Sequence, residues 1–232
     1  MGQWIEINAE DGKFAAYVAR PAAATKAPAI VVIQEIFGVN ADLRATCDKL
    51  AAQGFVALSP DLFWRAEPRI DLNKLDEKEW QRGFELYQSL NLDRAVRDIG
   101  ATLALARKLE GTSGKVGVMG FCLGGLLTFL TAARCDVDGA ASYYGGGTDQ
   151  HVEEGRKLKT PTVLHLAEDD EYISKDAQAK IKAGLGKNPL VEVHGYPGCK
   201  HAFARHKGVH YDAKAAKLAN ERTRALFDRT LR

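Results

Sequence analysis

The chain has 232 residues, of which 46% are hydrophobic and 27% are charged, a composition typical of soluble globular proteins. Its 32 basic and 30 acidic residues leave a net charge of +2, which is too small to favour binding to nucleic acid or to an anionic membrane. Chains of this length commonly fold around one core, so we expect a single domain over 1–232, present as a monomer.

The first thirteen residues carry charges early and contain no apolar run of signal-peptide length. No later segment approaches the roughly 18 apolar residues that span a bilayer. The four cysteines are scattered, which fits a reducing compartment better than a disulfide framework. A cytoplasmic protein without membrane contact is therefore expected.

Apolar runs of strand length alternate along the chain with longer stretches of helical period. Strands are predicted over 13–21, 27–36, 55–63, 114–122, 139–146, 160–170 and 190–198. Helices are predicted over 40–54, 91–111, 123–135, 174–185 and 211–231, and the polar segment 64–90 is predicted as an excursion over the sheet. Repeated β-then-α units predict an α/β fold, with a mostly parallel central sheet, helices on both faces and a ligand site at the carboxyl ends of the strands.

The segment Gly120-Phe121-Cys122-Leu123-Gly124 joins a predicted strand to a predicted helix. This arrangement is typical of the nucleophile elbow of α/β hydrolases, in which flanking glycines leave room for a strained bend. The helix N-terminus behind it favours negative charge on the sulfur or on a substrate oxygen. A lone cysteine is more often a small buried hydrophobe, but strand, bend and helix together favour Cys122 as a nucleophile suited to activated esters.

In this fold the triad acid and histidine follow the nucleophile along the chain in that order. The predicted strand 160–170 ends in three acids, of which Asp170 is preferred and Asp169 is the main rival, because spacing alone does not separate them. His201 precedes the terminal helix and is the expected base. Two other histidines, which fall inside predicted strands, are expected to be structural: His165 and His194.

The histidines near His201 could instead suggest a metal site with Cys199. Their spacing, with His206 and His210, matches neither a zinc ribbon nor an H-E-x-x-H helix. No metal and no cofactor are therefore expected.

Glu35 lies at the end of the apolar strand 27–36, where a buried carboxylate is costly unless it has a partner. In α/β hydrolases the loop after this strand supplies one oxyanion-hole N–H. We therefore expect Glu35 beside the nucleophile, with the backbone N–H groups of Ile36 and Leu123 forming the oxyanion hole. The alternative is a glutamate that pairs with an arginine or caps the following helix.

Five segments, QEIFGVN, SPDLF, GFCLGG, CKHAFAR and ANERT, closely resemble the dienelactone hydrolase (carboxymethylenebutenolidase) family, and the similarity runs from about Gln3 to the terminal helix. The resemblance implies an α/β-hydrolase fold and a triad of Cys122, His201 and Asp170, the last acid of its run. It also implies that the resting thiol is neutral and associated with Glu35, and that substrate displaces the carboxylate, which takes the thiol proton.

The resemblance also implies a substrate-binding set. Arg205 matches an arginine that binds the substrate carboxylate, and Tyr143 stands at the position of an active-site tyrosine. A second carboxylate-binding arginine of the family falls on Trp80, with Arg82 two positions further along. Phe84 and Tyr87 stand where the resemblance leads us to expect other aromatic residues, and Ala202 stands in place of a serine beside the histidine.

These features predict a carboxylic-ester hydrolase that opens a dienelactone to maleylacetate in the breakdown of aromatic compounds. Its expected partner is a small lactone or ester carrying a carboxylate. The alternative is a broader carboxylesterase or thioesterase with the same triad and an altered pocket, which the Trp80 difference favours. A redox sensor that uses Cys122 as a switch is a different class, and it would leave Asp170, His201 and Glu35 together without a purpose.

Overall fold

The computed structural model describes residues 2–22, 26–73 and 75–232. The strands are β1 (Gln3–Ala9), β2 (Gly12–Ala19), β3 (Ala27–Ile33), β4 (Val56–Pro60), β5 (Thr112–Phe121), β6 (Gly139–Tyr143), β7 (Thr162–Ala167) and β8 (Val191–Tyr196). The helices are α1 (Ala41–Ala52), α2 (Glu77–Ser89), α3 (Leu92–Lys108), α4 (Leu123–Arg134), α5 (Val152–Gly155), α6 (Lys175–Leu185) and α7 (Ala213–Leu231), with a 3₁₀ turn, η1 (Thr148–His151).

The strands form one eight-stranded sheet in the order β1-β2-β4-β3-β5-β6-β7-β8. β1 pairs antiparallel with β2, and β2 pairs antiparallel with β4, whereas β3–β4, β6–β7 and β7–β8 are parallel. Every residue of β3, β4, β6 and β7 is buried, as expected for strands covered on both faces. The predicted α/β-hydrolase fold is confirmed.

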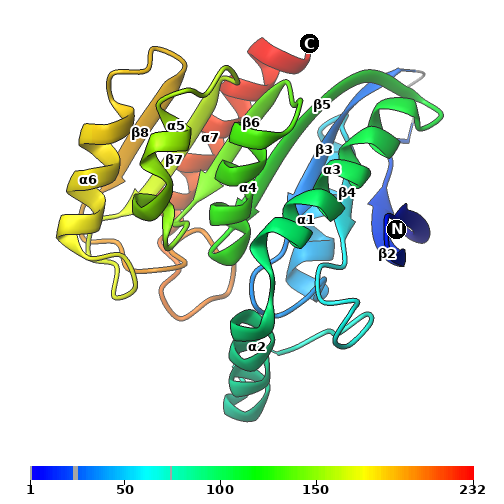
Figure 1. Ribbon diagram of the computed structural model, residues 1–232, viewed down its shortest axis with the longest axis horizontal. Coiled ribbons are helices and arrows are strands. Elements are labelled where there is room, and N and C mark those ends of the chain that lie inside the picture. The colour runs from blue at the N-terminus through cyan, green and yellow to red at the C-terminus, as the bar shows by residue number, and fades with distance from the viewer. Residues whose placement is uncertain (1, 23–25, 74) are drawn as a thin grey trace. The chain divides into compact units, whose positions relative to one another are not determined.

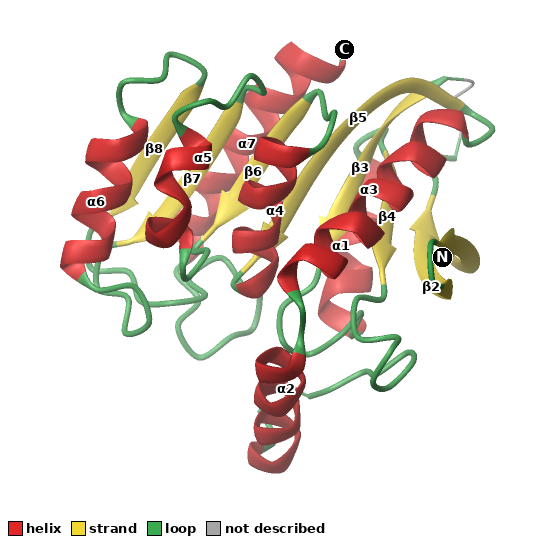
Figure 2. Cartoon of the chain, viewed as in Figure 1, coloured by secondary structure: helices red, strands yellow, loops and turns green. Residues whose placement is uncertain are grey.

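The chain divides into two compact units, one ending at Gly117 and the other running from Val118 to Arg232. In the first unit, α1 and α3 lie on opposite faces of β3 and β4 (Figure 1). In the second unit, α4, α5 and α6 cover one face of the strands and α7 covers the other (Figures 1 and 2). The prediction of a single domain over 1–232 remains a prediction.

Polar side chains begin the longer helices by accepting a backbone N–H from the first turn. Asn40 accepts from Leu43, and Ser174 accepts from Ala177. Three further helices begin in the same way, at Asp76, Asn91 and Asp212. Across the described residues, no helix combines the length and apolar character needed to cross a lipid bilayer.

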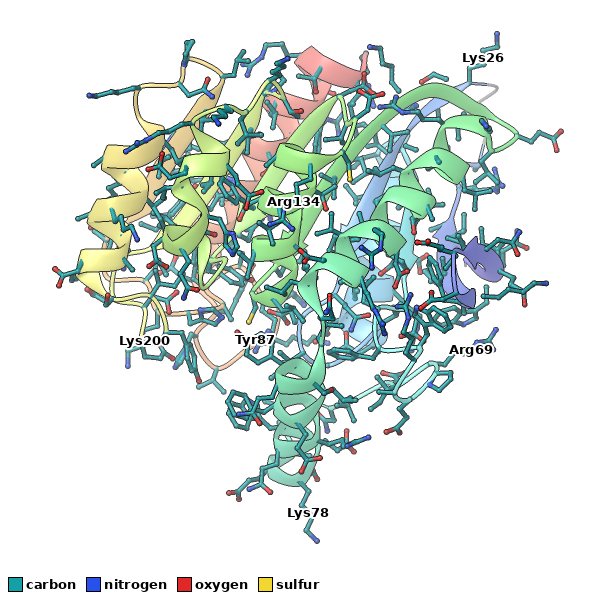
Figure 3. All side chains as sticks on the ribbon, viewed as in Figure 1. Lys26, Arg69, Lys78, Tyr87, Arg134 and Lys200 are labelled. Atoms are coloured by element: carbon teal, nitrogen blue, oxygen red, sulfur yellow. The ribbon has the colours of Figure 1, made fainter. Side chains whose placement is uncertain are left out.

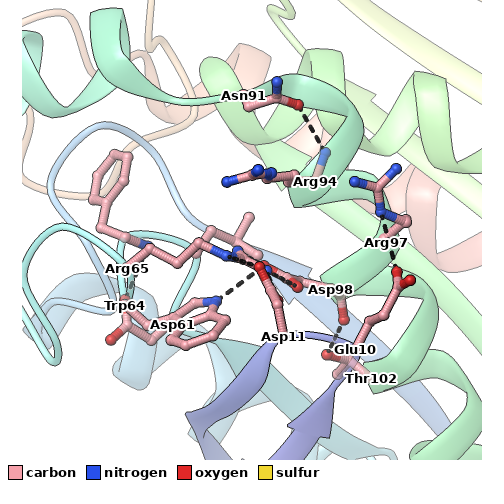
Figure 4. Close-up of polar contacts among 12 residues, drawn as sticks. Glu10, Asp11, Asp61, Trp64, Arg65, Asn91, Arg94, Arg97, Asp98 and Thr102 are labelled. Carbon is pink, nitrogen blue, oxygen red and sulfur yellow. Dashed lines mark hydrogen bonds and ion pairs between the residues drawn. The ribbon is translucent and has the colours of Figure 1, made fainter.

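Arg65 ties the β1–β2 turn of the first unit to α3. Its guanidinium donates to Asp11 at 2.9 Å and to the buried carboxylate of Asp98 at 2.6 Å, and the indole N–H of Trp64 donates to the same Asp98 at 3.0 Å (Figure 4). A buried carboxylate is tolerated when it is paired and hydrogen-bonded in this way. The predicted excursion 64–90 is thus anchored at its start.

The rest of this excursion contains α2, which the sequence did not predict as a separate helix. α2 extends away from the strands of its unit, with Lys78 at its far end (Figures 1 and 3). The loop before it is fixed to the segment after β3, because Leu72 N–H donates to the Phe37 carbonyl at 3.0 Å and Gly38 forms a bridge with Asp71. The excursion therefore orders the chain that follows Glu35.

Candidate active site

Cys122 stands between β5 and α4, where the sequence predicts a nucleophile elbow. Its backbone has φ 56° and ψ −117°, a combination that L-residues rarely adopt and that the surrounding structure must hold in place. The Cys122 N–H donates to the carbonyl of Tyr143 at 3.0 Å, and the Cys122 carbonyl accepts from Gly125 at 2.9 Å. The thiol is partly exposed at the N-terminus of α4, where negative charge is favoured.

Close packing behind this bend explains why residue 125 is a glycine. A Cβ at Gly125 would lie 2.3 Å from the Tyr143 carbonyl oxygen and 3.0 Å from Gly145. The backbones of α4 and the end of β6 therefore approach each other more closely than any side chain allows. This approach fixes where the sulfur of Cys122 stands.

His201 and Asp170 follow the carboxyl ends of β8 and β7, and they meet directly. The imidazole Nδ1 of His201 lies 2.9 Å from Asp170 Oδ2 and 3.1 Å from Oδ1. Asp170 also accepts the backbone N–H groups of Tyr172 at 2.8 Å and Ile173 at 3.2 Å, so the carboxylate is held in one orientation. Both His201 and Asp170 are buried.

Asp169, the rival candidate, has a different environment. Its exposed carboxylate lies 3.1 Å from Lys175 Nζ. Glu168 lies 3.3 Å from Lys182 Nζ, also as a surface ion pair. Of the three acids that end the predicted strand, Asp170 is therefore the one that the structure joins to His201.

The imidazole of His201 also interacts with Cys122. Burial lowers the pKa of His201, but the charge that Cys122 carries when ionised, its hydrogen bond and the hydrogen bond and charge of Asp170 outweigh burial and raise the pKa to about 10. The other ring nitrogen, Nε2, is buried and makes no hydrogen bond of standard geometry within the described residues. The structure thus brings Cys122, His201 and Asp170 together in one unit.

Two tyrosines that the sequence did not single out enclose the imidazole. The buried ring of Tyr144 and the exposed ring of Tyr172 each meet His201 edge-on, at centroid distances of 5.0 Å and 4.9 Å. Desolvation, with the charges of Glu171, Cys122 and Asp170, raises the pKa of Tyr172, and Arg205 opposes them. Arg205 and the Tyr172 hydroxyl therefore lie within electrostatic range of each other.

The backbone of His201 has its own partners. Its N–H donates to Glu171 at 3.3 Å, and its carbonyl accepts from His210 Nδ1 at 3.1 Å. Neither contact has a signal in the sequence, because both depend on the path of the loop before α7. Together they hold the loop that presents the imidazole.

Tyr143 was expected to bind substrate, but the structure does not bring its hydroxyl to His201. The side chain is fully buried, and its hydroxyl bonds to Asn220 at 2.9 Å and Thr223 at 2.7 Å on α7. Tyr144 is the residue whose ring contacts the imidazole.

Glu35 and Ile36 follow β3 in the first unit, where Glu35 is half-buried and Ile36 is buried. Gly83 of α2 packs against Ile36, since a Cβ there would lie 2.6 Å from the Ile36 carbonyl oxygen. The position of α2 therefore fixes the backbone of Ile36, whose N–H is an expected oxyanion donor. Leu123, the other expected donor, is the first residue of α4, and its N-cap Cys122 makes no side-chain capping bond.

The outer face of α2 carries a stack of exposed aromatic rings. Trp80 and Phe84 are nearly parallel at 5.5 Å, and Phe84 lies 6.0 Å from Tyr87. Arg82 faces elsewhere, as the sequence suggested, and its guanidinium is occupied by Glu67 and Glu85, each at 2.9 Å. The two carboxylates offset the positive charge that this guanidinium offers to a further anion.

Comparisons with known proteins agree with this fold. The family model for the dienelactone hydrolase family matches residues 14–231. A carboxymethylenebutenolidase of Pseudomonas putida is 41% identical to the chain over 94% of its length and 92% of the relative's. A carboxymethylenebutenolidase of Pseudomonas sp. (strain P51) is 34% identical over 97% of this chain and 94% of the relative.

Solved structures give the same result. A protein of Klebsiella pneumoniae, provisionally named a dienelactone hydrolase, superimposes on this chain with a TM-score of 0.87. The two are 26% identical, and the match covers 98% of both chains. A dienelactone hydrolase from Anabaena variabilis shares the fold, with a TM-score of 0.71 at 15% identity over 100% of this chain and 99% of that one. The fold, the elbow and the matched length agree, and the chain belongs to the dienelactone hydrolase family as a carboxymethylenebutenolidase-like hydrolase.

Proposed function

We propose that the protein opens the lactone ring of a dienelactone, 4-carboxymethylenebut-2-en-4-olide, to give maleylacetate. The observation that carries this proposal is the contact of His201 with both Asp170 and Cys122 beside a strained elbow. The 41% identity to the Pseudomonas putida carboxymethylenebutenolidase supports the substrate class. In this proposal Cys122 is the nucleophile, His201 the acid–base group and Asp170 the residue that orients it.

The proposed reaction has two halves. The Cys122 thiolate attacks the lactone carbonyl, the bond to the ring oxygen breaks, and that oxygen becomes an enolate that stays tethered to the acyl group now bound to sulfur. Water then adds to the acyl-cysteine, His201 takes a proton from that water, and the thiolate is released with the carboxylic acid as product. The N–H groups of Ile36 and Leu123 are the proposed donors to the oxyanion of each tetrahedral intermediate.

The raised pKa of His201 fits the order of these steps. Burial lowers that pKa, and the charge of the thiolate is the largest influence that raises it, so an imidazole beside the anionic sulfur keeps its proton up to about pH 10. When sulfur becomes acylated its charge disappears, and the pKa of His201 falls. The imidazolium can then protonate the tethered enolate, and the neutral imidazole can accept a proton from water.

Two further roles follow from the family resemblance. Glu35 is proposed to keep the resting thiol neutral and to take its proton when substrate arrives. Arg205 is proposed to bind the substrate carboxylate, because a guanidinium pairs well with a planar anion.

A comparison of two substrates tests the proposal. Turnover of cis- or trans-dienelactone is expected to exceed turnover of p-nitrophenyl acetate, and Cys122→Ala is expected to abolish both. A strong preference for the neutral ester would overturn the lactone assignment. Full activity of Cys122→Ala would overturn the nucleophile.

A second candidate is a broader carboxylesterase or thioesterase with the same triad. The paired state of Arg82 and the aromatic surface of Trp80, Phe84 and Tyr87 favour it, because α2 offers apolar rings rather than an available cation. Apolar p-nitrophenyl esters of increasing acyl length, added to the same assay, separate the two candidates. A rise in kcat/KM with acyl length above the value for dienelactone would favour the esterase.

A further inference from the structure

A set of mostly buried polar side chains in the second unit has no part in the proposed reaction. The hydroxyl of Tyr143 bonds to Thr223 at 2.7 Å and Asn220 at 2.9 Å. The same Thr223 hydroxyl lies 2.9 Å from Nε2 of His165, whose Nδ1 lies 2.9 Å from the Tyr196 hydroxyl. Five side chains thus form a continuous chain of hydrogen bonds between the sheet and α7.

The residue that donates to Tyr196 determines which groups donate and which accept along this series of hydrogen bonds. Arg222 donates to the Tyr196 hydroxyl at 3.2 Å, and a guanidinium can only donate. Tyr196 can therefore give its own proton to Nδ1 of His165. Burial, followed by the charges of His194 and Arg222, lowers the pKa of His165 well below its usual value, so the ring is neutral and carries its single proton on Nε2.

The remaining bonds follow from that tautomer. His165 Nε2–H donates to Thr223, the Thr223 hydroxyl donates to Tyr143, and the Tyr143 hydroxyl donates to the side-chain oxygen of Asn220. Each hydroxyl in the chain accepts one hydrogen bond and donates one. Linked bonds of this kind polarise one another and hold each side chain in a single orientation.

Tyr143 connects this chain to the nucleophile. Its carbonyl accepts the Cys122 N–H at 3.0 Å, and its ring lies 4.8 Å from the ring of Phe121, the residue before Cys122. The strained conformation of Cys122 must be held by such contacts. A tilt of Tyr143 would move the hydrogen bond that holds the elbow.

We propose that Tyr143 is a positioning residue for Cys122, with its carbonyl holding the elbow and its side chain fixed by its hydrogen bonds to Thr223 and Asn220 within this chain. The proposal rests on the proposed function, in which Cys122 is the nucleophile. It also gives a purpose to the ANERT segment, which covers residues 219–223 and supplies Asn220, Arg222 and Thr223.

Thr223→Val tests this proposal, because it removes the hydroxyl while keeping the side-chain shape. For the folded variant we expect kcat to fall about 10- to 100-fold with KM little changed, since small misplacement of a reacting group is costly. We also expect iodoacetamide to alkylate Cys122 with an altered rate and pH profile. Thr223→Ser restores the hydroxyl and should recover both readouts.

Thr230→Val is the matched control, because Thr230 lies on the same helix and bonds only to the Leu226 carbonyl among the contacts described for its hydroxyl. It should leave kcat and alkylation unchanged. If Thr223→Val lowers thermal stability but keeps wild-type kcat and alkylation, the positioning role is wrong. If Thr223→Val does not fold, Asn220→Ala, at an exposed position, must lower kcat in the same way or the proposal fails.

Substrate turnover and alkylation of Cys122 test the proposed function and the positioning role separately. If the wild-type protein turns over no lactone or ester, the proposed function is wrong. The alkylation rate of Cys122 in Thr223→Val against wild type still tests the positioning role, because it needs no substrate. An unchanged rate would overturn it.

Discussion

Asp169 and Asp170 are adjacent carboxylates with opposite environments, and this contrast gives a matched pair of variants. Asp170→Asn removes the carboxylate charge, and with the amide oxygen held by the N–H groups of Tyr172 and Ile173 its NH2 faces His201 Nδ1 in place of Oδ2. We expect kcat to fall about 100-fold or more, since the imidazole loses both its orientation and a charge that stabilises it. Asp169→Asn removes only an exposed ion pair with Lys175 and should change kcat less than about twofold.

The pH dependence of activity in the same two variants tests whether the charge of Asp170 raises the pKa of His201. Burial lowers the pKa of His201, while Cys122 and Asp170 raise it, to about 10 overall. Without the Asp170 charge the pKa of His201 falls, so the imidazolium is lost at lower pH. The alkaline limb of kcat, which reports the enzyme–substrate complex, should therefore move to lower pH in Asp170→Asn and stay in place in Asp169→Asn, and equal limbs would contradict the assignment.

Glu35 carries a second prediction at this scale, that the resting thiol is latent. At neutral pH, iodoacetamide should label Cys122 slowly in the absence of substrate, since only a thiolate reacts readily. Glu35→Gln should lower turnover, because an amide cannot take the thiol proton. Labelling of the resting enzyme as rapid as that of an accessible thiolate would instead favour a permanent imidazolium–thiolate pair.

The sequence allowed Cys122, His201 and the acidic run to be predicted, since a strand, a bend and the order of residues along the chain suffice for them. Spacing left Asp169 and Asp170 unresolved, and only loop geometry separates them. Tyr144 and Tyr172 escaped prediction for a similar reason. Their rings meet His201 only because three separate loops end at one edge of the sheet.

A single added methyl group, in Gly125→Ala, tests how closely the elbow between β5 and α4 is packed. Gly125→Ala would place a Cβ 2.3 Å from the Tyr143 carbonyl oxygen, and we expect it to lower the free energy of unfolding by about 1–3 kcal/mol or more, with loss of activity. Gly146→Ala is the control, because nothing lies within 4 Å of its Cβ. Urea unfolding of both variants measures the difference, and equal stability would show that the close approach is relaxed in solution.

Elements with a strong apolar pattern were predicted closely, whereas four others were not. β1 is an edge strand whose residues are mostly exposed or half-buried, so its sequence lacks a core pattern. α2 buries only Gly83 and Leu86 of its thirteen residues, which leaves little helical periodicity to detect. The turn η1 and helix α5 have four residues each and are too short for any periodic signal.

At the scale of the whole molecule, the question is whether the two compact units unfold together, as a single domain requires. The three tryptophans, Trp4, Trp64 and Trp80, all lie before Gly117, so tryptophan fluorescence reports only on the first unit. Gly125 lies in the second unit. Far-UV circular dichroism reports on the helices of both.

We expect a single domain, and therefore expect Gly125→Ala to shift the fluorescence midpoint in urea although the substitution and the tryptophans lie in different units. With a slope of about 3 kcal/mol per molar urea for a chain of this size, a loss of about 1–3 kcal/mol moves the midpoint by about 0.3–1 M. Fluorescence and circular dichroism should give the same midpoint in both proteins. If the two units unfold independently, the fluorescence midpoint stays at its wild-type value while circular dichroism shows an earlier transition, and the chain would then contain two domains rather than one.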